Sequence, residues 1–326
     1  MKTVGITGTG SYAPEKILTN ADLEKMVDTS DEWITARTGI KQRHIADENT
    51  ATSDLAFKAA ERALDQANIA GEDVELLIVA TVTPDMFFPS TACVVQDKLG
   101  ANGHAAFDIS AACSGFLYGL AAGRCLVGTG LFKNALVIGA ETLSKITDWE
   151  DRSTCVLLAD GAGAAVLEPL DSGKGICDFC LGADGGSGNL LYLPGCGSRN
   201  PASAAMLEEK QQYLKMRGNE LFKIAVRVLV EAASQALKKC NLTPDDVDWY
   251  VPHQANVRII NAAVKRLGIP IEKACINVDR YGNTSAASIP IALDEANRNG
   301  KFSKGDTIVL DAFGGGLTWG ACVLEW

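Results

Sequence analysis

Long apolar runs, positive charge and histidine are all scarce in this chain of 326 residues. No apolar run reaches the roughly 18 residues of a membrane-spanning helix, so the sequence excludes a helical integral membrane protein. The formal net charge of −10 does not suit general nucleic-acid binding, because the phosphate backbone selects basic surfaces. We therefore expect neither a membrane nor a nucleic acid among the partners.

Cysteine is plentiful, with ten residues, but its spacing lacks the pairs that a zinc site or a disulfide framework needs. The one C-x-x-C pair, Cys177 and Cys180, lies in a segment that alternates like a strand. Side chains three apart in a strand face opposite sides of the sheet, and no second pair supplies further zinc ligands. We expect structural thiols here, with no metal site and no disulfide.

The amino-terminal residues 1–8 read as a strand followed by glycines, without the pattern of a signal peptide. We therefore expect a cytoplasmic protein. The apolar content of 47% is ordinary for a globular chain, and the length suffices for two domains.

The sequence contains echoes at a distance of about half its length. Residues 72–79 are echoed by residues 245–251, with Asp246 lying 173 positions after Asp73. Residues 163–168 are echoed by residues 320–325. A solenoid repeats every roughly 20–50 residues, so we expect two similar halves instead, 1–170 and 171–326.

Near-continuous apolar runs predict strands buried on both faces, alternating with helices. The expected strands are 2–8, 75–82, 105–109, 134–140, 155–168, 175–183, 247–251, 274–278, 306–312 and 319–325. The expected helices are 20–27, 30–37, 53–68, 91–99, 114–128, 219–239, 256–267 and 284–298. The pattern predicts an α/β fold with helices on both faces of mixed sheets. A glycine- and serine-rich stretch at 182–218 predicts a long surface loop.

One cysteine has the setting of a nucleophile. Cys113 follows the expected strand 105–109 through a turn of small residues and precedes an apolar helix. The positive end of a helix favours thiolate, the form of cysteine that attacks carbonyl carbon.

With only three histidines, each can be weighed as a catalytic group. His44 and His104 lie in polar or turn segments and are best interpreted as surface or structural residues. His253 follows the expected strand 247–251 at the mouth of a strand-to-helix loop, where catalytic groups gather in α/β proteins.

An asparagine in the second half completes a candidate triad. Asn283 lies in the turn before the expected helix 284–298, the position that Cys113 takes in the first half. Its alternative role is that of a turn or capping residue. If Cys113, His253 and Asn283 converge, two N–H donors face a thiol. Such donors suit the enolate formed when a malonyl thioester loses carbon dioxide.

A glycine run at 314–316 follows the expected strand 306–312. Glycines let backbone N–H groups approach a substrate oxygen closely, which suits an oxyanion hole. A tight loop is the alternative interpretation.

Four segments, 108–115, 251–256, 281–288 and 312–316, closely resemble β-ketoacyl-acyl-carrier-protein synthase III. The resemblance extends over essentially the whole chain, with the four motifs in the family's order. It implies a thiolase-like fold of duplicated halves in α-β-α-β-α layers, with mixed five-stranded sheets, and a homodimer.

The resemblance also implies a reaction. Cys113 takes an acyl group from an acyl-CoA primer, with acetyl-CoA expected. Malonyl-acyl carrier protein then loses carbon dioxide, and the enolate, stabilised by His253 and Asn283, attacks the acyl-cysteine. The product, 3-oxoacyl-acyl carrier protein, starts fatty acid synthesis. No cofactor is implied, because the coenzyme A thioester is a substrate.

Further site residues follow from the resemblance alone. Backbone N–H groups of Cys113 and Gly315 form the oxyanion hole, and Phe313 forms an active-site wall. The residues implied to hold coenzyme A are Trp33, Arg37 and Arg152. The acyl pocket would comprise Leu143, Leu158 and Phe88, the last inserted by the dimer partner. The residues implied to bind the acidic carrier protein are Gln254, Ala255, Asn256, Arg258, Lys265, Arg266 and Lys223.

Two alternatives stay open on the sequence. Related enzymes that prime polyketide or quinolone synthesis share these motifs. A papain-type cysteine hydrolase has the same order of cysteine, histidine and asparagine, but the residues around Cys113 do not match its signature.

Overall fold

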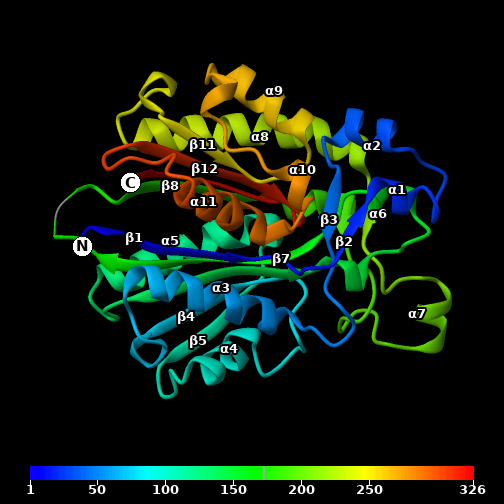
Figure 1. The fold of residues 1–326 in the computed structure, drawn as a ribbon, viewed down its shortest axis with the longest axis horizontal. Helices are drawn as coiled ribbons and strands as arrows, with labels where there is room; N and C mark the ends of the chain where they lie inside the picture. Colours follow the sequence, from blue (N-terminus) through cyan, green and yellow to red (C-terminus); the bar gives the residue numbers. More distant parts are fainter. Residues whose placement is uncertain (172) are drawn as a thin grey trace.

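The computed structural model describes residues 1–171 and 173–326, and Figure 1 shows two sheets separated by helices. The strands are β1 (Val4–Tyr12), β2 (Ile17–Thr19), β3 (Gln42–His44), β4 (Leu76–Ala80), β5 (Ala105–Ile109), β6 (Ala135–Thr142), β7 (Asp160–Pro169), β8 (Ile176–Ala183), β9 (Leu191–Tyr192), β10 (Lys215–Met216), β11 (Trp249–Pro252), β12 (Thr307–Gly314) and β13 (Thr318–Glu325).

Most helices lie close to their expected positions. They are α1 (Asn20–Leu23), α2 (Asp31–Thr38), α3 (Thr52–Ala67), α4 (Thr91–Leu99), α5 (Gly115–Gly128), α6 (Arg152–Cys155), α7 (Ala204–Glu208), α8 (Gly218–Lys239), α9 (Val257–Leu267), α10 (Val278–Tyr281) and α11 (Ser288–Arg298). In the part of the chain that the structure describes, no helix is both long and apolar enough to span a membrane.

The two large sheets have matching strand orders. The first is β1-β7-β6-β4-β5 and the second is β11-β12-β13-β8. In both, parallel strands at one edge are followed by antiparallel strands: β5, β4 and β6 are parallel in the first sheet, and β11 and β12 in the second. Along the chain, β7 is the last strand of the first sheet and ends at Pro169, and β8 is the first strand of the second sheet and begins at Ile176. The division expected after residue 170 falls between these two strands and stays a prediction.

The second sheet has four strands, and none of them covers residues 274–278, so the strand expected there is wrong. Only a parallel bridge between Tyr250 and Ala274 takes the place of a fifth strand. The Gln254 side chain explains the interruption, because its amide donates to Cys275 O and accepts from Asn277 N. A side chain thus takes the backbone partners that a longer strand would need.

Helices α5 and α11 form the central layer between the sheets, as Figure 1 shows. Helix α5 is apolar on nearly all sides, which is expected for a helix buried between two layers. The main core joins residues of both halves, including Phe116 and Leu120 of α5, Leu293 of α11, Val137 of β6 and Leu310 of β12. Helices α3 and α4 cover the first sheet, and α8 and α9 cover the second.

Both central helices are entered through the same tight turn. Ala112 and Ser285 have φ angles of 45° and 48°, and each begins a short 3-10 helix, η2 (Ala112–Ser114) and η7 (Ser285–Ala287). Because these turns lie 173 residues apart, like Asp73 and Asp246, the counterpart of Cys113 is Ala286. The expected equivalence of Asn283 with Cys113 is therefore wrong by three residues.

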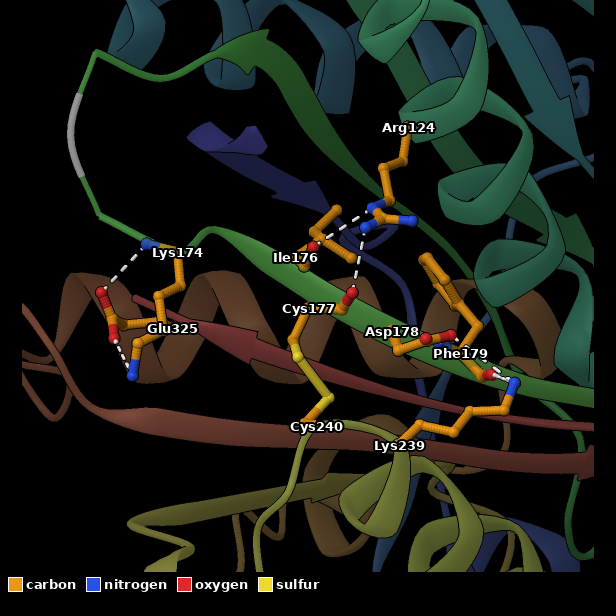
Figure 2. Close-up of a disulfide and its surroundings, with 9 residues drawn as sticks. All are labelled: Arg124, Lys174, Ile176, Cys177, Asp178, Phe179, Lys239, Cys240 and Glu325. Atoms are coloured by element: carbon orange, nitrogen blue, oxygen red, sulfur yellow. Dashed lines mark hydrogen bonds and ion pairs between the residues drawn. A yellow bond between two sulfur atoms is a disulfide. The ribbon is translucent and has the colours of Figure 1, made fainter. Parts of the chain in front are cut away.

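Cys177 of β8 and Cys240, the residue after α8, form a disulfide (Figure 2), contrary to the expectation of free thiols. In the register of β8 with β13, Asp178 pairs with Val323 and Ile176 with Leu324, so Cys177 is an unpaired bulge residue. A bulge resets the alternation of side chains. Cys177 and Cys180 consequently pack against the same core beneath α8.

Candidate active site

Cys113 lies in η2, at the amino-terminal end of α5 and close to the second sheet. A Cβ added to Gly314 of β12 would lie 2.6 Å from Cys113 N, so only glycine permits this approach. The sulfur has hydrogen-bonding partners in the N–H groups of Cys113 and Gly315 and in the Ser285 hydroxyl. Two backbone donors at the nucleophile are the arrangement of an oxyanion hole.

Burial raises the pKa of the Cys113 thiol to about 11, despite these hydrogen bonds. The expectation that the helix end favours thiolate is therefore incomplete, because desolvation outweighs the donors. Cys113 therefore rests as a thiol, and an attack by its sulfur would require a group that removes the proton.

A cavity of about 330 Å³ opens at Cys113. It brings together four of the residues implicated by the sequence, Asn283, Gly315, Leu143 and Leu158. Its other walls are mainly apolar, which suits an acyl chain.

Part of the cavity wall comes from the segment expected to be a surface loop. The residues it contributes are Leu191, Tyr192, Leu193, Leu214 and Met216. Strands β9 and β10 pair there, and the segment also holds the short helix α7. The consecutive apolar residues 190–193 were the sequence signal for a buried wall, but the glycine and serine content favoured a loop.

His253 follows β11 and is buried, with its Nδ1 lying 2.6 Å from Ser288 Oγ. The backbone N–H of Gln254 donates to the same oxygen, so the Ser288 proton is available to Nδ1. This tautomer leaves Nε2 carrying the proton. Burial lowers the pKa of His253 to about 4, so the ring is neutral at neutral pH.

Asn283 is held by its acceptor end. Its Oδ1 accepts from Ser285 N at 2.9 Å, and its backbone pairs with Leu157 and Ala159. The Nδ2 donor is therefore the polar atom left for a ligand in the cavity. His44 stacks on Tyr281 and His104 is exposed, in accord with structural or surface roles for both.

The three residues implied to hold coenzyme A lie together. The guanidinium carbons of Arg37 and Arg152 each lie 5.0 Å from the Trp33 ring centroid. Arg152 is oriented by donating to Asp28 O at 2.6 Å. An indole flanked by two guanidinium groups presents both a stacking surface and positive charge.

A basic surface, defined here as Lys223, Arg258, Lys265 and Arg266, lies on α8 and α9. All four side chains are exposed, and Arg258 lies 5.6 Å from the Phe222 ring, across the α8–α9 contact. Ala255 and Asn256 are half-buried beside it, and Asn256 caps α9 and donates to Arg37 O.

Gln254 does not belong to this surface. Its side chain is 1% exposed and is engaged by the backbone of Pro252, Cys275 and Asn277. The prediction that Gln254 contacts a carrier protein is therefore wrong, and the residue instead supports the His253 loop.

Two phenylalanines lie outside the cavity. Phe88 is 85% exposed, next to Phe87 at 81%, so within one chain it closes no pocket. Phe313 is buried in an apolar cluster with Leu317 and Leu221, and among the described residues it does not line the cavity.

Sequence reasoning missed two polar residues beside the thiol, Ser285 and Glu141. The Glu141 signal was visible as a lone carboxylate at the end of the apolar run 135–142. Within the described ranges, no cluster of His, Cys, Asp and Glu is placed to hold a metal ion.

Comparison with known proteins agrees with this geometry. Residues 107–185 match the family model 3-oxoacyl-[acyl-carrier-protein] synthase III, and residues 237–326 match the model of its C-terminal part. A relative from Desulfitobacterium hafniense, beta-ketoacyl-[acyl-carrier-protein] synthase III, is 58% identical across 100% of this chain and 98% of its own.

Solved structures confirm the thiolase-like fold. The 3-oxoacyl-[acyl-carrier-protein] synthase III of Aquifex aeolicus has a TM-score of 0.93 at 51% identity, covering 99% of this chain and 100% of its own. The priming β-ketosynthase of the R1128 polyketide pathway has a TM-score of 0.92 at 33% identity, covering 99% and 96%. These relatives rule out the papain-type alternative. Sequence identity along the whole chain, a shared fold and a cysteine beside two backbone N–H donors lead to one conclusion: the chain belongs to the 3-oxoacyl-[acyl-carrier-protein] synthase III family of acyl-transferring condensing enzymes.

Proposed function

We propose that this enzyme condenses an acyl-CoA primer, such as acetyl-CoA, with malonyl-acyl carrier protein through an acyl-Cys113 intermediate. The observation that carries the proposal is the Cys113 thiol at an apolar cavity, with the Cys113 and Gly315 N–H groups beside its sulfur. The sulfur attacks the thioester carbonyl, the two N–H groups hold the oxyanion, and coenzyme A leaves.

In the second stage, malonyl-acyl carrier protein loses carbon dioxide and its enolate attacks the acyl-cysteine. Two neutral donors serve the enolate oxygen, His253 Nε2–H and Asn283 Nδ2–H, because the opposite end of each side chain is occupied by Ser288 or Ser285. The low pKa of His253 supports a donor role rather than that of a cation. The product, 3-oxoacyl-acyl carrier protein, starts fatty acid synthesis.

The surfaces support the expected partners. Trp33 with Arg37 and Arg152 would take the adenine and phosphates of coenzyme A, and the basic surface on α8 and α9 would dock an acidic carrier protein. Phe87 and Phe88, both exposed, support a homodimer in which Phe88 closes the partner's acyl pocket. Phe313, which is buried, would support the active-site wall near the malonyl group of the second substrate.

A cytoplasmic location is part of the proposal, because acylation needs Cys113 as a thiol. In a reducing compartment the Cys177–Cys240 disulfide would be reduced to two thiols as well. Fractionation of the source cells tests this location.

A second function in the same class is priming of polyketide synthesis. It is favoured by the similarity to the R1128 priming ketosynthase. The two functions differ in primer, and the cavity of about 330 Å³ admits more than an acetyl group.

Intact-protein mass spectrometry after exposure to a panel of acyl-CoAs tests the proposal. We expect one acyl group per chain at Cys113, none in Cys113→Ser, and a preferred chain length that separates the two functions. His253→Ala and Asn283→Ala should still self-acylate but lose malonyl decarboxylation. Loss of labelling with decarboxylation intact in those two variants would contradict the assigned roles.

A further inference from the structure

Glu141 is a fully buried carboxyl at the end of β6, near the nucleophile. Its oxygens accept from the Thr83 hydroxyl at 2.6 Å, the Thr81 hydroxyl at 3.2 Å and the Val82 N–H at 3.1 Å. These bonds fix the loop after β4, but a neutral residue would do so without the penalty of burying an ionisable group. A carboxyl retained in such a place is a candidate for chemistry.

The Ser285 hydroxyl joins Glu141 to Cys113. It lies within hydrogen-bonding reach of the Glu141 carboxyl and of the Cys113 sulfur, and η7 packs against both β6 and η2, so the hydroxyl stands between the carboxyl and the thiol. Ser285 has a left-handed φ of 48°, like Ala112 at the equivalent turn of the first half. Backbone conformations of this kind persist where surrounding structure enforces them, and they cluster at active sites.

Among the described residues around the thiol, His253 is a poor proton acceptor. Burial lowers the pKa of His253 to about 4, and that ring already receives a proton at Nδ1 from Ser288. Burial raises the pKa of Glu141 to about 7, so near neutral pH the carboxyl is poised between holding and releasing a proton.

The ionisable group that faces Glu141 is Cys113, from η2. The other neighbours present hydroxyls and an amide from the loop after β4, Ser285 from η7, and Gly161 across the pair with β7. Asp160, one residue before Gly161, lies on the opposite face, where it binds Ser144.

We propose that Ser285 is a catalytic residue that relays the Cys113 proton to Glu141 during self-acylation, with Glu141 acting through Ser285. As the sulfur bonds to the acyl carbon, its proton passes to Ser285 Oγ while the Ser285 proton passes to the Glu141 carboxylate. When the C–S bond to coenzyme A breaks, the proton returns along the same line to the leaving thiolate. Atoms and charge balance, and no other reactant is needed.

The test is the pH profile of acyl-Cys113 formation, measured by rapid quench with radiolabelled acetyl-CoA. In the wild type the rate should rise with pH and level off above about 7, where Glu141 is ionised. In Ser285→Ala the rate near pH 7 should fall on the order of 10²–10⁴-fold, the usual contribution of acid–base catalysis. It should then keep rising through pH 9, because hydroxide must deprotonate the thiol.

Ser285→Ala removes the relay without disturbing the bonds of Glu141 to the loop after β4, and its turn accepts alanine, as Ala112 shows in the other half. Glu141→Gln should give the same profile. Ser53→Ala is the matched control, because Ser53 is a buried serine on α3 bonded to Lys98, and it should keep the wild-type profile.

The inference is overturned if the acylation rate of Ser285→Ala follows the wild-type pH profile. It is also overturned if that rate falls by the same factor at every pH and still levels off near pH 7. It rests on the proposed function, so a second arm measures alkylation of Cys113 by iodoacetamide in the same variants and pH range. If no acyl-CoA labels the wild type, the proposed function fails, while the alkylation profiles still decide the relay.

Discussion

Replacing Glu141 by glutamine should remove a large pH-dependent loss of stability. The pKa of this carboxyl is raised by burial from 4.5 to about 7 in the folded protein. Between these values the folded state holds a proton that the unfolded state has released. Stability contributed by the protonated carboxyl is therefore complete below pH 4.5 and is lost as pH rises through 7.

The size of the loss follows from the two pKa values. At about 1.4 kcal/mol for each pH unit, the span from 4.5 to about 7 corresponds to about 3 kcal/mol. Glutamine has a similar shape and no charge, so its variant should lack this contribution. The difference in unfolding free energy, Glu141→Gln minus wild type, should rise by about 3 kcal/mol between pH 4.5 and pH 8.

Urea unfolding followed by circular dichroism at half-unit steps of pH measures this difference, and other titrating groups cancel in the subtraction. Ser285→Ala serves as the companion variant. This variant keeps the Glu141 carboxyl but removes a hydrogen bond that lowers its pKa. The pKa of the folded state should therefore rise further, and the loss of stability should continue to a higher pH than in the wild type. A difference that stays flat from pH 4.5 to 8 would refute the reasoning, because Glu141 would then titrate alike in both states.

Three further predictions concern the rest of the site. Gly314→Ala should abolish self-acylation, because the new Cβ would lie 2.6 Å from Cys113 N, whereas Gly185→Ala, with open space around its Cβ, should acylate normally in the same labelling assay. Arg152→Ala should raise the KM for acetyl-CoA about tenfold, as expected for a lost charged contact of about 1.4 kcal/mol, with little change in the maximal rate of acylation. Arg258→Glu should raise the KM for malonyl-acyl carrier protein and weaken its salt dependence, with self-acylation unchanged.

Local sequence patterns predicted most of the architecture. The apolar run after Cys113 became helix α5, and the expected helix 91–99 is confirmed as α4. The expected strand 155–168 begins later, at Asp160, because α6 occupies residues 152–155. The expected strand 274–278 was wrong because the side chain of Gln254, 21 residues before Cys275 and 23 before Asn277, took its backbone partners. Periodicity reports on neighbours in sequence, and it contains no information about a distant side chain.

The site shows the same division. The four motifs place Cys113, His253 and Gly315 after strands β5, β11 and β12, and Asn283 in the turn after helix α10, which is a local property of the chain. Their roles stay predictions, but their setting beside two backbone N–H donors, in a buried loop and at a cavity supports them. Gln254 illustrates the limit, because a polar residue beside a basic helix was expected at the surface and is buried.

The sequence by itself determined the duplicated halves, the turn that carries Cys113 and the family. Only the tertiary structure decided that Ser285 and Glu141 lie near that thiol, that residues between 191 and 216 line its cavity, and that Cys177 reaches Cys240. The physical reason is that turns and apolar periods depend on adjacent residues, whereas burial and convergence arise when two sheets pack on shared helices. Desolvation in that core raises the pKa of Cys113 and of Glu141, and it exists only once the halves have closed on each other.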